Sequence, residues 1–81
     1  MNKSEIQQIG HFLSDVQEGL CEGDPPTALH LQLQELYKII PTLMNETFKT
    51  KDKQLKTVLT LLELKARQYT DEIEKKLAVK N

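Results

Sequence analysis

The sequence predicts an all-α protein, a three-helix bundle formed by a single domain over residues 1–81. Three separate segments carry apolar residues at alternating intervals of three and four, which is the spacing of one face of an α-helix. Only three Gly and three Pro occur, so the connections between the segments are short. The one cysteine, Cys21, excludes an internal disulfide. Packed helices or self-association must therefore supply the stability that other small domains gain from cross-links.

The first helix is predicted over about residues 4–21. Its apolar stripe consists of Ile6, Ile9, Leu13, Val16 and Leu20. Ser4 with Gln7 three residues later has the pattern of a capping box, which places the start of the helix. Gly23 can adopt the left-handed conformation that ends a helix. Asp24 is a candidate N-cap for the next helix, because two prolines suited to a first turn follow it.

The second helix is predicted over about residues 25–48. Its stripe consists of Leu29, Leu33, Leu36, Ile40, Leu43 and Thr47. The phase of the stripe continues through Pro41, which favours one helix kinked near that residue. A proline inside a helix removes a backbone hydrogen bond and disfavours helical geometry in the residue before it. The alternative is therefore a short turn at Ile40 with a new helix beginning at Pro41.

The third helix is predicted over about residues 53–78, with Asp52 as its cap. Its stripe consists of Leu55, Leu59, Leu62, Ala66, Tyr69 and Ile73, widened by Val58 and Leu77. At 1.5 Å per residue the second and third helices are roughly 36 and 39 Å long, so they match as an antiparallel hairpin. The first helix would lie against this hairpin.

Three leucines lie outside these stripes and form a candidate interface. At 100° per residue Leu31 lies about 200° from Leu29, and Leu61 and Leu64 lie about 240° and 180° from Leu55. They cannot all face one core. Exposed apolar clusters mark interaction sites, although single exposed leucines are also normal on monomers. We expect a homodimer in which these leucines form the contact, and a non-catalytic role in protein–protein interaction or assembly.

The charges divide the chain into halves of opposite sign. Residues 1–48 hold two basic and seven acidic groups, a net charge of −5, and residues 49–81 hold nine and five, a net charge of +4. The two halves could attract each other within the bundle or across a dimer. Four lysines form a candidate basic patch between the second and third helices: Lys49, Lys51, Lys53 and Lys56. A solvated loop is the simpler reading, and a nucleic-acid-associated accessory protein is the alternative function.

No catalytic motif is present in the sequence. It has no glycine-rich phosphate loop, no nucleophile elbow and no paired histidines on one helical face. His11, His30 and a single cysteine do not make a zinc site. The sequence therefore predicts no catalytic residues, no cofactor, no metal and no enzymatic activity. It also predicts no secretory signal and no membrane segment, and hence a cytoplasmic protein.

Residues 22–38, Glu22-Gly-Asp-Pro-Pro-Thr-Ala-Leu-His-Leu-Gln-Leu-Gln-Glu-Leu-Tyr-Lys, resemble the turn and helix of small helical proteins of tailed bacteriophages. This resemblance implies a phage or prophage accessory protein that binds a host or phage partner in the cytoplasm of the host cell. It implies no site residue, because these proteins share no catalytic motif.

Overall fold

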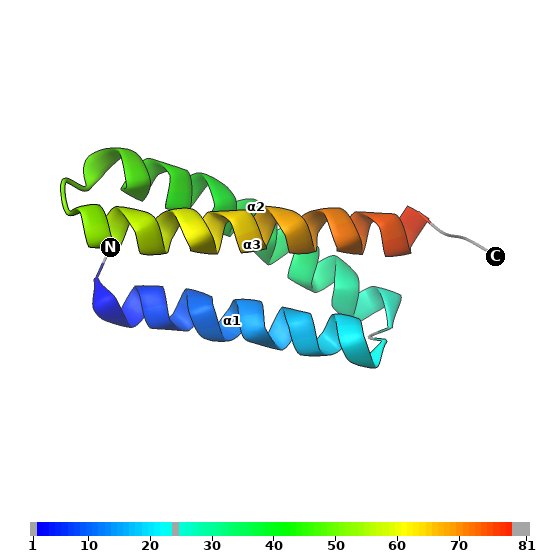
Figure 1. Cartoon of the computed structure of the whole chain (residues 1–81). Helices are drawn as coiled ribbons and strands as arrows, with labels where there is room; N and C mark the ends of the chain where they lie inside the picture. Colours follow the sequence, from blue (N-terminus) through cyan, green and yellow to red (C-terminus); the bar gives the residue numbers. More distant parts are fainter. Residues whose placement is uncertain (1, 24, 79–81) are drawn as a thin grey trace.

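A computed structural model describes residues 2–23 and 25–78 of the chain. They form three helices, α1 (Lys3–Glu22), α2 (Pro26–Lys49) and α3 (Lys53–Ala78), and these described residues contain no strand. The molecule measures 48 × 18 × 15 Å along its principal axes. Helices α1 and α3 run in the same direction and α2 runs against both, so that the start of α1 lies at the same end as the α2–α3 turn (Figure 1). The predicted three-helix bundle with an α2–α3 hairpin is confirmed.

The N-terminus of α1 differs from the sequence prediction in its cap. Asn2 occupies the N-cap, and its side-chain Oδ1 accepts a hydrogen bond of 2.8 Å from the backbone N–H of Glu5. The predicted capping box of Ser4 and Gln7 is therefore wrong, because Ser4 already lies in the first turn. Asparagine caps helices as well as serine does, so the amide two residues earlier can satisfy the free N–H instead.

The α1–α2 connection follows the predicted turn chemistry. Gly23 has φ +80° and its N–H donates to the carbonyl of Gly19 over 2.9 Å, which ends α1. Pro25 occupies the N-cap position of α2 in an extended conformation, and Pro26 is the first helical residue. Proline fits this position because its missing N–H would have no partner in the first turn. The predicted cap residue Asp24 lies outside the described residues.

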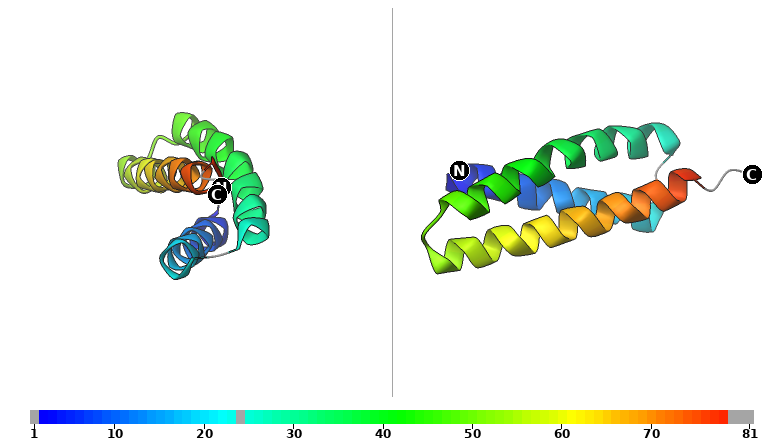
Figure 2. Two further views of the ribbon diagram at one scale, coloured as in Figure 1. Left: turned by 90° about the vertical axis from the view of Figure 1, so that its right-hand side faces the viewer. Right: turned by 90° about the horizontal axis from the view of Figure 1, so that it is seen from above.

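Helix α2 continues through Pro41 without interruption and ends at Lys49. The alternative of a turn at Ile40 is therefore wrong. Pro41 has no N–H to donate to the carbonyl of Tyr37, and its ring crowds that carbonyl, which bends a helix. Figure 2 shows that α2 curves along its length as it crosses the other two helices.

Asp52 caps α3 as predicted. Its side-chain Oδ1 accepts hydrogen bonds from the backbone N–H groups of Gln54, over 3.0 Å, and Leu55, over 3.4 Å. These are two of the N–H groups that have no partner within the helix. Only residues 50–52 separate α2 from α3, and the Asp52 cap fixes the residue at which α3 begins.

The core follows the predicted stripes. The main cluster of buried residues draws on all three helices and consists of Leu13, Val16, Leu20, Leu29, Leu36, Ala66, Tyr69 and Ile73. Leu43 and Leu59 are also buried, on α2 and α3. Val58 was expected to widen the α3 stripe, but its side chain is exposed. It lies about 100° around the helix from Leu59, which takes it past the edge of the buried face.

Two contacts between side chains show the register of the α2–α3 hairpin. The hydroxyl of Tyr37 donates to Glu74 Oε2 over 2.6 Å, and Arg67 Nη2 donates to Met44 Sδ over 3.1 Å. Met44 is seven residues after Tyr37 in α2, and its partner Arg67 is seven residues before Glu74 in α3. The two helices are therefore antiparallel and stay in the same register between these contacts. The hydrogen bond to the Glu74 carboxylate raises the pKa of Tyr37 above its ordinary value, and desolvation and the charge of Glu74 act in the same direction.

Candidate interaction surface

All three leucines predicted for the interface are on the surface. Leu31, Leu61 and Leu64 have 61%, 55% and 57% of their area exposed. The hairpin register, however, separates Leu31 from the other two. Leu31 lies six residues to one side of the Tyr37–Glu74 contact and Leu61 lies 13 residues to the other side. At 1.5 Å per residue this places them about 29 Å apart along the hairpin, so the structure does not bring them together.

The exposed apolar residues of α3 form a continuous strip. Val58, Leu61 and Leu64 follow one another at intervals of three residues, which makes them neighbours on the helix surface. Val58 is 43% exposed, close to the values for the two leucines. We call these three residues the α3 strip. Val58 was not among the predicted interface residues, because the apolar spacing of α3 assigned it to the edge of the core.

The surroundings of the α3 strip are polar but neutral or basic. Thr57 and Thr60 are exposed beside it, and their hydroxyls donate to the carbonyls of Lys53, over 3.0 Å, and Lys56, over 2.8 Å. These hydroxyl groups therefore already have an acceptor within the helix. Together with Leu61, these four residues line a shallow hollow of about 390 Å³. Between residues 53 and 68 none of the exposed residues of α3 is acidic.

The predicted basic patch lies at the α2–α3 turn. Its members are all exposed: Lys49, Lys51, Lys53 and Lys56. Phe48 directly precedes them in the chain, and 84% of its area is exposed. The ion pairs between described side chains each lie within one helix: Lys38–Glu35, Arg67–Glu63 and Lys75–Asp71.

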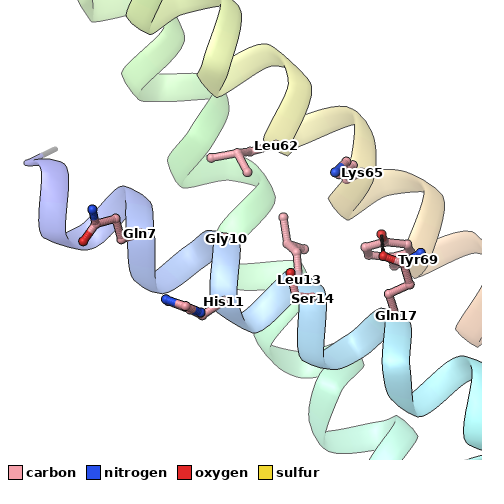
Figure 3. Close-up of a pocket in the computed structure, with 9 residues that line it drawn as sticks. All are labelled: Gln7, Gly10, His11, Leu13, Ser14, Gln17, Leu62, Lys65 and Tyr69. Atoms are coloured by element: carbon pink, nitrogen blue, oxygen red, sulfur yellow. Dashed lines mark hydrogen bonds between the residues drawn. The ribbon is translucent and has the colours of Figure 1, made fainter.

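A groove between α1 and α3 was not foreseen from the sequence (Figure 3). It has a volume of about 540 Å³. Small residues of α1, Gly10 and Ser14, line one side, and Leu62 and Lys65 of α3 line the other. The hydroxyl of Tyr69 donates to Gln17 Oε1 across the groove over 3.2 Å. Gly10 could have indicated the groove, because a glycine inside a helix is unfavourable and open space surrounds its Cβ position.

The groove brings together few groups that could perform chemistry. His11 is its one histidine, and the nine lining residues include no carboxylate to orient an imidazole or activate Ser14. Within the described ranges 2–23 and 25–78, no three His, Cys, Asp or Glu side chains are placed to hold a metal ion. Among the same residues, no helix has the length and apolar character needed to cross a membrane.

Comparisons of the chain with protein-family models, with curated proteins and with solved structures found no match. The resemblance of residues 22–38 to helical phage proteins therefore stays a prediction. The exposed α3 strip and the basic patch beside Phe48 are therefore the features that bear on function.

Proposed function

We propose that this protein is a non-catalytic protein–protein interaction or assembly module that self-associates through the α3 strip. The observation that carries the proposal is the exposure of three adjacent apolar side chains, Val58, Leu61 and Leu64, on a helix whose other face holds its buried residues. Burying such side chains removes apolar area from water and is favourable. Leu31 is too distant to join the same contact.

The resemblance of residues 22–38 to phage proteins supports a finer form of this proposal. In that form the module is a phage or prophage accessory protein in the host-cell cytoplasm, and its assembled form binds a host or phage protein. The host or phage protein would bind at the end of the molecule that carries Leu31, since Leu31 lies in the segment that resembles phage proteins. The α3 strip would serve assembly and the α2 surface would remain available to the second partner.

Sedimentation velocity over a series of micromolar concentrations tests the self-association. We expect the average mass to rise from 9.3 kDa toward twice that value. A variant with Leu61→Glu and Leu64→Glu should stay monomeric, because four charges would be buried in the contact without partners. Its far-UV circular dichroism should match the unsubstituted protein, since both side chains are on the surface.

The matched control is Leu31→Glu, which makes the same chemical change at an equally exposed leucine outside the α3 strip. It should self-associate like the unsubstituted protein. The proposal is wrong if the unsubstituted protein stays monomeric, or if the double variant associates as strongly as the control.

A second candidate function is binding of single-stranded nucleic acid at the α2–α3 turn. The exposure of Phe48 beside the basic patch supports it, because single-strand binding combines cationic side chains with an aromatic ring on which a base can stack. We expect binding of an oligonucleotide at low salt, lost steeply as salt increases. Phe48→Ala should weaken it, and changing the four lysines to Gln should abolish it. Absence of any binding at low salt would remove this candidate.

A further inference from the structure

Along the outward face of α3, the residue types read in one direction are complementary to those read in the opposite direction. This face comprises the residues that lie within about 70° of the direction opposite the buried Leu59, at 100° per residue. From residue 53 to residue 72 they are Lys53, Gln54, Thr57, Leu61, Leu64, Lys65, Gln68, Asp71 and Glu72. All of them are exposed except Glu72, which is half-buried. Lys65, Gln68 and Glu72 lie on the side of this face that borders the grooves between α3 and α1. The pattern is apolar at its centre, polar on both sides, basic at one end and acidic at the other.

We propose that a second copy of this chain docks on this face with its α3 antiparallel, about a two-fold axis that passes between residues 62 and 63. The inference rests on the proposed self-association and adds its geometry, in which Leu61 and Leu64 form the apolar centre and Val58 lies just outside the outward face. A two-fold contact uses the same surface on both copies, so each residue must suit the residue at the mirrored position. Leu61 would lie opposite Leu64, Thr57 opposite Gln68, and Lys53 opposite Glu72.

These three mirrored pairs are chemically compatible. The two leucines of each copy form an apolar centre. Thr57 and the second copy's Gln68 are polar groups of complementary hydrogen-bonding capacity. At each end Lys53 meets the second copy's Glu72, an opposite-charge pair that the two-fold axis makes twice.

The two charged residues are available for this pairing. Lys53 makes no ion pair with a described residue of its own chain. Glu72 has no ion pair with one either, and its carboxylate accepts a hydrogen bond of 3.5 Å from Gln68 Nε2, which is at the limit for such a bond. A second copy therefore offers each group a partner that the single chain does not provide.

The spacing also suits helix-to-helix packing. Residues 54, 57, 61, 64, 68 and 71 are separated by intervals of 3, 4, 3, 4 and 3, the repeat of a coiled-coil contact line. A parallel arrangement in register would instead place Lys53 opposite Lys53 and Asp71 opposite Asp71. Like charges facing each other disfavour association, so the charge pattern selects the antiparallel arrangement.

The contact is small. It contains two large apolar side chains per copy, and we expect it to bury less than about 1,200 Å² in total, at the lower end of specific interfaces. The dimer should therefore be weak, and its population should rise with protein concentration.

A charge-exchange experiment tests the register. Lys53→Glu alone places Glu opposite Glu at both ends of the contact, and Glu72→Lys alone places Lys opposite Lys. By sedimentation velocity each variant alone should dimerise at least about tenfold more weakly than the unsubstituted protein. An equimolar mixture of the two should recover the dimer, because both ends of the mixed dimer then pair Glu with Lys.

The control is Lys49→Glu, the same charge change at an exposed lysine of α2 outside the outward face, which should leave dimerisation unchanged. Circular dichroism of each variant verifies that it is folded. The register is wrong if the variants alone dimerise like the unsubstituted protein, or if mixing recovers nothing. If the register is wrong but the double variant Leu61→Glu, Leu64→Glu still abolishes the dimer, only the proposed geometry fails. When that double variant still dimerises, the proposed function fails too.

Discussion

Replacing Leu36 with alanine is expected to lower the free energy of unfolding by about 2–5 kcal/mol, the usual cost of truncating a fully buried leucine. Leu36 is 0% exposed and lies midway along α2, in the cluster that joins the three helices. A domain of 81 residues has a total stability of about 4–12 kcal/mol. The variant should therefore lose a large share of its stability, and chemical denaturation followed by circular dichroism measures it.

The control for this prediction is Leu31→Ala, which deletes the same atoms five residues earlier on the exposed side of α2. It should change the free energy of unfolding by no more than about 0.5 kcal/mol. Equal losses at the two positions would contradict the assignment of Leu36 to the core and of Leu31 to the surface.

Replacing Pro41 with alanine is expected to stabilise the protein by about 1–3 kcal/mol. Alanine restores an N–H that can donate to the carbonyl of Tyr37, and it removes the ring that crowds this carbonyl. The intrinsic helix preference of the two residues differs by about 3 kcal/mol, and part of this gain is offset because alanine makes the unfolded chain more flexible. The side chain of Pro41 is exposed, so the change leaves no cavity.

Pro26 provides the matched control, because it is a proline of the same helix at the first helical position, where no hydrogen bond is lost. Pro26→Ala should be neutral or lower the free energy of unfolding by up to about 1 kcal/mol. If Pro41→Ala destabilises the protein instead, the curvature of α2 is required for its packing and outweighs the restored hydrogen bond.

The fold could be predicted because the apolar period, the glycine stop and the Asp52 cap all point to the same three helices. The sequence did not decide the N-cap of α1, because two nearby residues are equally suited to that position. Asn2 and Ser4 are both good N-caps, and the choice between them depends on where the packing of α1 places its first turn. The continuity of α2 through Pro41 was favoured by the unbroken stripe, since Leu36 and Leu43 must both face α3.

The candidate surface could be predicted only in part. Helical periodicity shows that Leu61 and Leu64 lie outside the core, because that follows from their angle to Leu55. It cannot show that Leu31 lies at the other end of the hairpin, because this depends on which residues of α2 and α3 lie side by side, as Tyr37 and Glu74 do. The groove between α1 and α3 also depends on the distance between helices, which a one-dimensional pattern does not contain.

The most direct measurement of the central claim is an isotope-filtered NOE experiment on an equimolar mixture of ¹³C-labelled and unlabelled chains. We expect intermolecular NOEs between the methyl groups of Leu61 and Leu64, and none at Leu31, at concentrations where sedimentation detects the dimer. Intermolecular NOEs confined to Leu31, or a dimer without any at Leu61 and Leu64, would contradict the assignment of the α3 strip as the contact between copies.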